Sequence, residues 1–247
     1  MDLLRRQTGN FKPAPGNFPK TGDDGMVAGG IFCITLTDLA SWLSRNPTSG
    51  STSEAPRGGT AGPGSGPYPA GTSTDPTLPK HTIYAPKTPP AGNLSLPVIA
   101  WGNGGCATDS GSYKNFLTEI ASHGYVVIAD GPGGSGSGQT LVQDMRNSLD
   151  WAFKGGASKF GNIDLTRVAT AGHSCGGLEA MSTAYHDERV KRILMFNIAI
   201  FQDDRRYLLS EIKVPVAWFI GGKSDMGYAG VRLSLASCVC GKANIPD

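Results

Sequence analysis

The stretch Val168-Ala-Thr-Ala-Gly-His-Ser174-Cys-Gly-Gly-Leu-Glu-Ala-Met181 decides how the rest of the chain is interpreted. It starts as a short apolar run typical of a buried strand and continues with the apolar spacing of a helix. At the junction, Gly172, Ser174 and Gly176 form the pattern Gly-x-Ser-x-Gly. Such a nucleophile elbow exposes the serine hydroxyl at the top of a sheet, in a turn too tight for side chains two residues away. We therefore predict that Ser174 is a nucleophile and that the Cys175 amide is an oxyanion donor.

Strands and helices alternate on both sides of this segment. Apolar patterns predict strands at residues 81–84, 97–101, 125–129, 168–171, 192–201 and 214–220, and helices at residues 113–122, 141–153, 178–185 and 207–212. Strands that are apolar on both faces imply a parallel sheet covered by helices. The fold class is therefore α/β, with a mostly parallel, doubly wound sheet whose ligand site lies at the carboxyl ends of the strands.

The composition divides the 247 residues into three parts. Residues 1–66 are expected to be poorly ordered, because they are rich in Gly, Ser and Pro. This composition extends to residue 79, so regular structure is expected to begin near His81. Residues 67–230 form the predicted α/β domain, and residues 231–247 are an atypical tail.

Between about residue 66 and residue 230, the chain resembles fungal α/β-hydrolases related to cutinase-like and chlorophyllase-like esterases. The resemblance rests on Leu96-Pro-Val-Ile-Ala-Trp-Gly-Asn-Gly-Gly-Cys106, Glu119-Ile-Ala-Ser-His-Gly-Tyr-Val-Val-Ile128, Gly172-His-Ser-Cys-Gly-Gly177 and Gly221-Gly-Lys-Ser-Asp225. It implies an α/β-hydrolase fold, here incomplete at its C-terminal end. It also implies a secreted serine esterase that acts on a small-molecule or polymeric ester.

In this fold the loop after the strand at 97–101 supplies a second oxyanion donor, for which Gly104 or Gly105 is the candidate. A plain glycine turn is the alternative. The catalytic acid follows a later strand, which makes Asp225 the candidate, with Asp203 and Asp204 as substitutes. An aspartate that only caps a turn is the alternative for Asp225.

The triad order Ser, acid, His requires a histidine after Asp225, and the chain has none there. Its four histidines are His81, His123, His173 and His186. A serine without a general base remains protonated and is a poor nucleophile. Impaired activity is therefore expected, and we hypothesise that the gene product is truncated after about residue 230. A catalytically silent binding module with the same fold is the alternative.

The cysteines suggest a link between the two loops of the predicted site. Cys106 ends the glycine loop and Cys175 follows the nucleophile, and in the resembled fold these loops face each other. A disulfide between them would fix both oxyanion donors, while two small buried thiols are the alternative. No cysteine pair has zinc-ligand spacing, so neither a metal nor an organic cofactor is expected.

Other function classes are weakly supported. Residues 131–136 match the dinucleotide pattern Gly-x-Gly-x-x-Gly, but the next predicted strand ends in the serine turn rather than in an acid. The formal net charge of +2 argues against a nucleic-acid partner. No apolar run is long enough for a membrane span. Residues 1–10 lack the apolar core of a signal peptide, so a cytoplasmic location is the alternative to the extracellular one that the resemblance implies.

Overall fold

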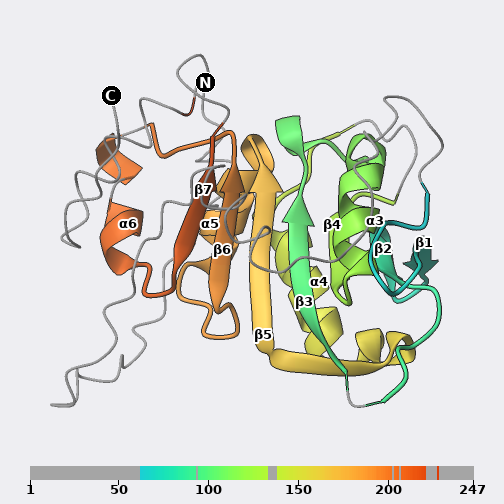
Figure 1. The fold of residues 1–247 in the computed structure, drawn as a ribbon. Helices are drawn as coiled ribbons and strands as arrows, with labels where there is room; N and C mark the ends of the chain where they lie inside the picture. The colour runs from blue at the N-terminus through green and yellow to red at the C-terminus, as the bar shows by residue number, and fades with distance from the viewer. Residues whose placement is uncertain are drawn as a thin grey trace, which may run out of the picture.

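The structure is a computed structural model, and it describes residues 62–92, 94–132, 138–201, 203–205, 207–220 and Gly227. The predictions for residues 1–61, Asp225 and the tail 231–247 lie outside these residues. Among the described residues, a seven-stranded sheet has the order β1-β2-β4-β3-β5-β6-β7 (Figure 1). The strands are β1 (Ala70–Asp75), β2 (Leu78–Pro86), β3 (Ser95–Gly102), β4 (Val126–Asp130), β5 (Asn162–His173), β6 (Arg192–Phe196) and β7 (Val216–Phe219).

Five of these strands are parallel, which confirms the predicted α/β class with a mostly parallel sheet. Strands β4, β3, β5, β6 and β7 pair in parallel with one another, whereas β2 pairs antiparallel with both β1 and β4. The α-helices are α3 (Lys114–Ser122), α4 (Val142–Phe153), α5 (Cys175–Ala184) and α6 (Tyr207–Glu211). Short 3-10 helices are η1 (Gly104–Cys106), η2 (Gly111–Tyr113), η3 (Gly156–Phe160) and η4 (Asp203–Arg205).

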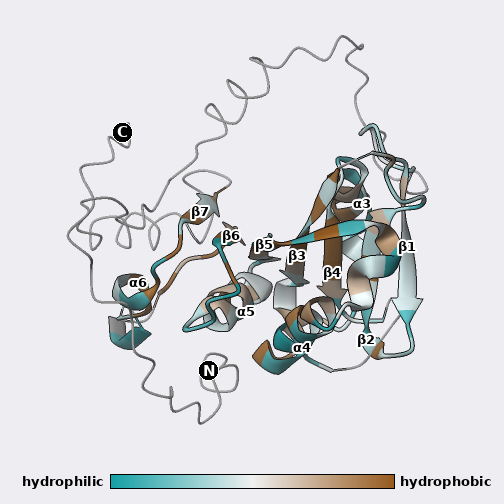
Figure 2. Cartoon of the chain, turned by 90° about the horizontal axis from the view of Figure 1, so that it is seen from below, coloured by the Kyte–Doolittle hydropathy of each residue, from teal (hydrophilic) through white to brown (hydrophobic). Residues whose placement is uncertain are grey.

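Helices cover both faces of the sheet. Viewed along the strands, α4, α5 and α6 lie on one face and α3 lies on the other (Figure 2). Two apolar clusters correspond to these faces, one around Met145, Leu149 and Met181 and the other around Trp101 and Leu117. The connection from β3 to β4 runs along one face and the connection from β4 to β5 along the other, so the strand order reverses beside β3. Ligand sites of open α/β sheets lie at such a reversal, at the carboxyl ends of the strands.

The structure departs from the sequence predictions at the N-terminal edge of the sheet. Regular structure was expected to begin near His81, but residues 70–75 already form β1, whose residues alternate between inward and outward positions and pair with β2. Main-chain bonds extend the packed region to Pro63, whose carbonyl accepts from the Ala70 amide at 2.7 Å. Small and hydroxyl-bearing side chains are sufficient to form β1, because only one face of this edge strand is buried.

Two other strands differ in length from the predictions. β6 ends at Phe196 instead of residue 201, because Asn197 has φ 53° and the chain leaves the sheet there. The following residues Ile198, Ala199 and Ile200 are nevertheless buried. β5 begins at Asn162, six residues before the predicted start, and its first half is polar and only partly buried.

No helix among the described residues has the length and apolarity required to cross a bilayer.

Candidate functional site

Ser174 lies between the end of β5 and the start of α5, as its sequence pattern predicts. Its backbone has φ 51° and ψ −119°, a conformation that costs free energy for any residue with a side chain. The Ser174 amide donates to the Phe196 carbonyl at 2.8 Å, which ties the turn to the end of β6. The surrounding structure thus holds a half-buried serine in a strained turn at the carboxyl edge of the sheet.

Three glycines allow the start of α5 to pack directly on the sheet. Gly102 and Gly172 are partners in the register of β3 and β5, and Gly176 lies against both. A Cβ on Gly172 would lie 2.2 Å from the Gly176 carbonyl oxygen, and a Cβ on Gly176 would lie 2.1 Å from the Gly102 carbonyl. No larger residue fits at Gly172 or Gly176 unless the helix moves.

The loop after β3 faces the start of α5 and is covalently joined to it. Gly105 and Cys106 both have positive φ, at 66° and 51°, so the chain turns sharply at this point. Cys106 and Cys175 form a disulfide with their Cα atoms 5.2 Å apart. The predicted disulfide is therefore confirmed, and the alternative of two buried thiols is excluded.

Asn103 organises the same loop from inside the protein. Its fully buried side chain accepts from the Trp101 indole at 3.1 Å and donates to the carbonyls of Ala107 at 2.8 Å and Asp130 at 2.7 Å. Its own carbonyl accepts from the amides of Gly176 and Cys106. The sequence patterns did not predict this role, although the position of Asn103 inside the glycine loop was a signal for it.

Tyr113 connects the loop to the residue before the candidate nucleophile. The Gly104 amide donates to Tyr113 Oη at 2.9 Å, and the same oxygen lies 2.9 Å from His173 Nδ1. These two contacts join Gly104 of the loop, Tyr113 of η2 and His173 of β5 into one chain of polar groups.

The amides of Cys175 and Gly105 form no hydrogen bond with other described residues, in contrast to their neighbours. Cys175 is the first residue of α5, where main-chain amides have no partner within the helix. Gly105 is exposed, and a Cβ added to it would meet no atom within 4 Å. The amides of Gly104 and Gly176 are already bonded, to Tyr113 and Asn103.

Each of the four histidine side chains pairs with a group other than Ser174 within the described residues. His81 Nε2 donates to the Asp144 carbonyl at 2.9 Å, and His173 pairs with Tyr113. His123 and His186 lie at the ends of α3 and α5 and pair with Glu119 and Glu211 at 3.0 and 3.1 Å.

The candidate acid stays a prediction, because Asp225 is outside the described residues. Of the substitutes, Asp204 is exposed beside Arg205 at 3.8 Å, and Asp203 begins η4. Residues 133–137, which contain most of the dinucleotide-like pattern, are also outside the described part.

Aromatic rings pack together at the same edge of the sheet. The Trp101 ring lies 5.3 to 5.7 Å from the rings of Tyr113, Phe116 and Phe196, measured between centroids. Phe196 in turn stacks on Phe219 at 4.5 Å. The carbonyl of Phe196 also accepts from the Ser174 amide, so this aromatic cluster and the serine turn are both anchored at the end of β6.

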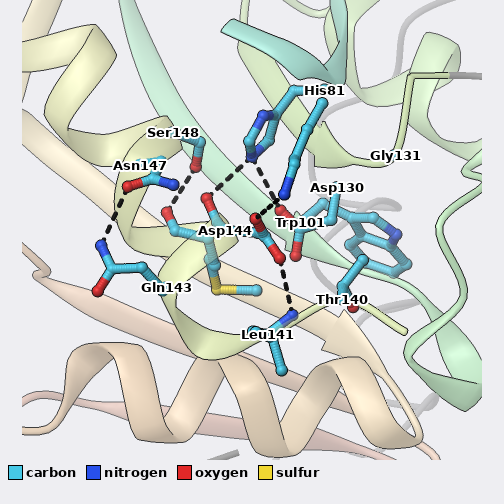
Figure 3. A network of polar contacts seen from close by, with 12 residues as sticks. His81, Trp101, Asp130, Gly131, Thr140, Leu141, Gln143, Asp144, Asn147 and Ser148 are labelled. Atoms are coloured by element: carbon cyan, nitrogen blue, oxygen red, sulfur yellow. Dashed lines mark hydrogen bonds and ion pairs between the residues drawn. The ribbon is translucent and has the colours of Figure 1, made fainter. Parts of the chain in front are cut away.

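Beneath the loop lies a buried polar network that joins β2, β4 and α4 (Figure 3). His81 and Asp130 are both fully buried, with His81 Nε2 3.3 Å from Asp130 Oδ1. The Asp144 carbonyl accepts from His81, and Figure 3 also labels Thr140 nearby. Glu179 of α5 is hydrogen-bonded to Thr140. The sequence patterns did not predict this network, because its members come from separate elements.

Three cavities lie elsewhere among the described residues. One lies between β2 and α4 near Trp151, another lies beside β1, and a third adjoins Asp109 and Pro132. Ser174 lines none of these three, and the candidate site is defined here by the arrangement of its two loops.

No protein-family model matches the chain. No curated protein matches it either.

Proposed function

We propose that the chain carries the site of a carboxylic ester hydrolase of the α/β-hydrolase type, with Ser174 as the nucleophile. The observation that supports this most strongly is the strained turn of Ser174 between a parallel strand and a helix, packed on three glycines. A structural serine has no need of such a conformation, whereas an exposed attacking hydroxyl does.

The reaction would form an acyl-enzyme and then hydrolyse it. Ser174 Oγ attacks the ester carbonyl carbon, and the carbonyl oxygen becomes an oxyanion. The amides of Cys175 and Gly105 would donate to that oxyanion. We prefer Gly105 to Gly104, because the Gly104 amide already donates to Tyr113. The C–O bond of the ester breaks, and the alcohol leaves with the proton that the Ser174 hydroxyl has lost. Water then adds its oxygen to the acyl group, which leaves as the acid, and returns a proton to the serine.

The disulfide supports the assignment of both donors. Cys106 adjoins Gly105 along the chain, and Cys175 carries the other amide, so the Cys106–Cys175 bond links the two donor segments covalently. Preorganised donors stabilise a developing charge without reorganising during the reaction.

One observation favours the silent-module alternative. His81, His123, His173 and His186 pair with Asp144, Glu119, Tyr113 and Glu211, respectively. None of these four hydrogen bonds is made to Ser174. Loss of a triad member lowers turnover by roughly 10⁴- to 10⁶-fold. We therefore expect weak but Ser174-dependent hydrolysis, with Asp225 as the proposed acid of any complete triad.

The experiment compares p-nitrophenyl butyrate hydrolysis by the chain, Ser174→Ala and the exposed-serine control Ser112→Ala. Hydrolysis that Ser174→Ala removes and Ser112→Ala retains is the expected result. Equal rates in all three proteins would refute the esterase proposal. Binding of a butyl boronate without hydrolysis would then support the silent module.

A further inference from the structure

Glu179 is a buried acid that the proposed reaction does not use. It lies on α5, five residues after Ser174, and has no solvent exposure. Its Oε1 is 2.7 Å from Thr140 Oγ1. Its Oε2 has no hydrogen-bond partner among the described residues and lies 2.8 Å from the position of a Cβ on Gly102. A carboxylate with a single neutral donor is costly in such a place.

The partner of Glu179 is the residue that holds the oxyanion loop. The Thr140 amide donates to the Cys106 carbonyl at 2.7 Å, and Thr140 Oγ1 lies 3.2 Å from the same carbonyl oxygen. Residues Ala107 and Gln139 form a bridge beside this contact. Thr140 therefore stands between the interior of α5 and the disulfide-bonded end of the loop.

The proton arrangement favours a neutral Glu179. A protonated Glu179 would donate to Thr140 Oγ1, and the Thr140 hydroxyl would donate to the Cys106 carbonyl, which can only accept. An ionised Glu179 would instead take the Thr140 proton away from that carbonyl. Only the neutral acid lets the hydrogen bonds run continuously from α5 to the loop.

The charges around Glu179 also favour its neutral form. It faces Asp130 at the end of β4 and Asp144 on α4, and beyond them lie His81 on β2 and the exposed Lys80. Both carboxylate oxygens of Asp130 lack a hydrogen-bond partner among the described residues. Burial, followed by the neighbouring carboxylate of Asp130, raises the pKa of Glu179 to about 8.

We propose that neutral Glu179 is a positioning residue that braces the Gly104–Cys106 loop through Thr140, and that its ionisation releases this loop at alkaline pH. The catalytic consequence rests on the proposed function, since the loop carries the Gly105 donor. The release of the loop does not rest on the proposed function, because the loop and its disulfide exist whether or not Ser174 reacts.

The test measures how fast a phosphine reduces the Cys106–Cys175 bond in the full chain at about pH 6 and about pH 10, on either side of the Glu179 pKa of about 8. Mass mapping after alkylation separates these cysteines from the other three. The control is Glu179→Gln, whose amide remains neutral and can donate to Thr140. Comparing the two proteins at each pH cancels the reagent's own pH dependence.

We expect equal reduction rates for the chain and Glu179→Gln at about pH 6, and severalfold faster reduction of the unmodified chain at about pH 10. Thr140→Val should be reduced quickly at both pH values, and Thr140→Ser should behave like the unmodified chain. Identical pH dependence in the chain and Glu179→Gln would overturn the proposal. If Glu179→Gln does not fold, the comparison of Thr140→Val with Thr140→Ser tests the proposal instead. Equal reduction rates for these two variants would overturn it.

The kcat/KM for p-nitrophenyl butyrate serves as the second readout. It should fall above about pH 8 in the chain but not in Glu179→Gln, with little change in KM. If no Ser174-dependent activity exists, the proposed function fails while the reduction experiment still decides the role of Glu179.

Discussion

Asn103 shows at the scale of one residue how the loop is built. Its buried amide group donates to two carbonyls while its oxygen accepts from an indole, so every polar atom of the side chain is used. A buried side chain whose polar atoms are all hydrogen-bonded favours one geometry of the loop, because a shift of the loop would leave a buried polar atom without a partner. The loop is therefore positioned by an amide that does not itself face the candidate site.

We predict that Asn103→Asp destabilises the protein by about 2–4 kcal/mol, because a carboxylate would face the carbonyls of Ala107 and Asp130. The midpoint of urea unfolding measures the change. Asn115→Asp, an exposed change of the same kind on α3, should move the midpoint little. Equal shifts for the two variants would contradict the role of Asn103.

At the scale of elements, the decisive contact is between the start of α5 and the ends of β3 and β5. Glycines at residues 102, 172 and 176 permit it, and they place the Cys175 amide beside the loop. We predict that Gly176→Ala lowers the unfolding free energy by roughly 3 kcal/mol or more, since the methyl group would overlap the Gly102 main chain.

Thermal unfolding of Gly176→Ala beside Gly62→Ala provides the comparison. Gly62 has open space around its Cα, so its substitution should be nearly neutral. A Gly176→Ala protein as stable as the Gly62→Ala control would show that α5 can withdraw from the sheet at little cost.

The elements also show what the sequence could predict. The serine turn was predictable because its pattern lies between an apolar strand and a helix, and the Cys106–Cys175 bond was predictable because the two loops face each other in the resembled fold. The end of β6 was not predictable, because the apolar run continues to residue 201 whereas Asn197 turns the chain out of the sheet. The network of His81, Asp130 and Glu179 was also missed, since its members come from separate elements that only the folded sheet brings together.

For the whole molecule, the buried acids predict how stability changes with pH. Burial raises the pKa of Glu179 from 4.5 to about 8, and burial also raises that of Asp130 from 3.8 to about 6. A raised pKa means that the folded state binds the proton more tightly than the unfolded state. This contribution is complete below about pH 4, declines as the pH rises, and is lost above about pH 8.

We therefore predict that the free energy of unfolding falls by about 2–4 kcal/mol between about pH 5 and about pH 9. Urea titrations at several pH values measure it, and Glu179→Gln should show a smaller decline. Asp164, whose pKa is lowered to about 2 by bonds from Thr166 and Arg167, titrates below this window and does not contribute. Stability that rises with pH across the window would contradict a neutral Glu179.

Covalent trapping tests whether Ser174 is a nucleophile. The full chain and Ser174→Ala would each be incubated at length with excess fluorophosphonate and then digested and mapped by mass spectrometry. We predict a phosphonyl group on the peptide that contains Ser174 in the folded chain, and none on that peptide after urea unfolding or in Ser174→Ala. An unmodified Ser174, or modification that persists in unfolded protein, would contradict the account.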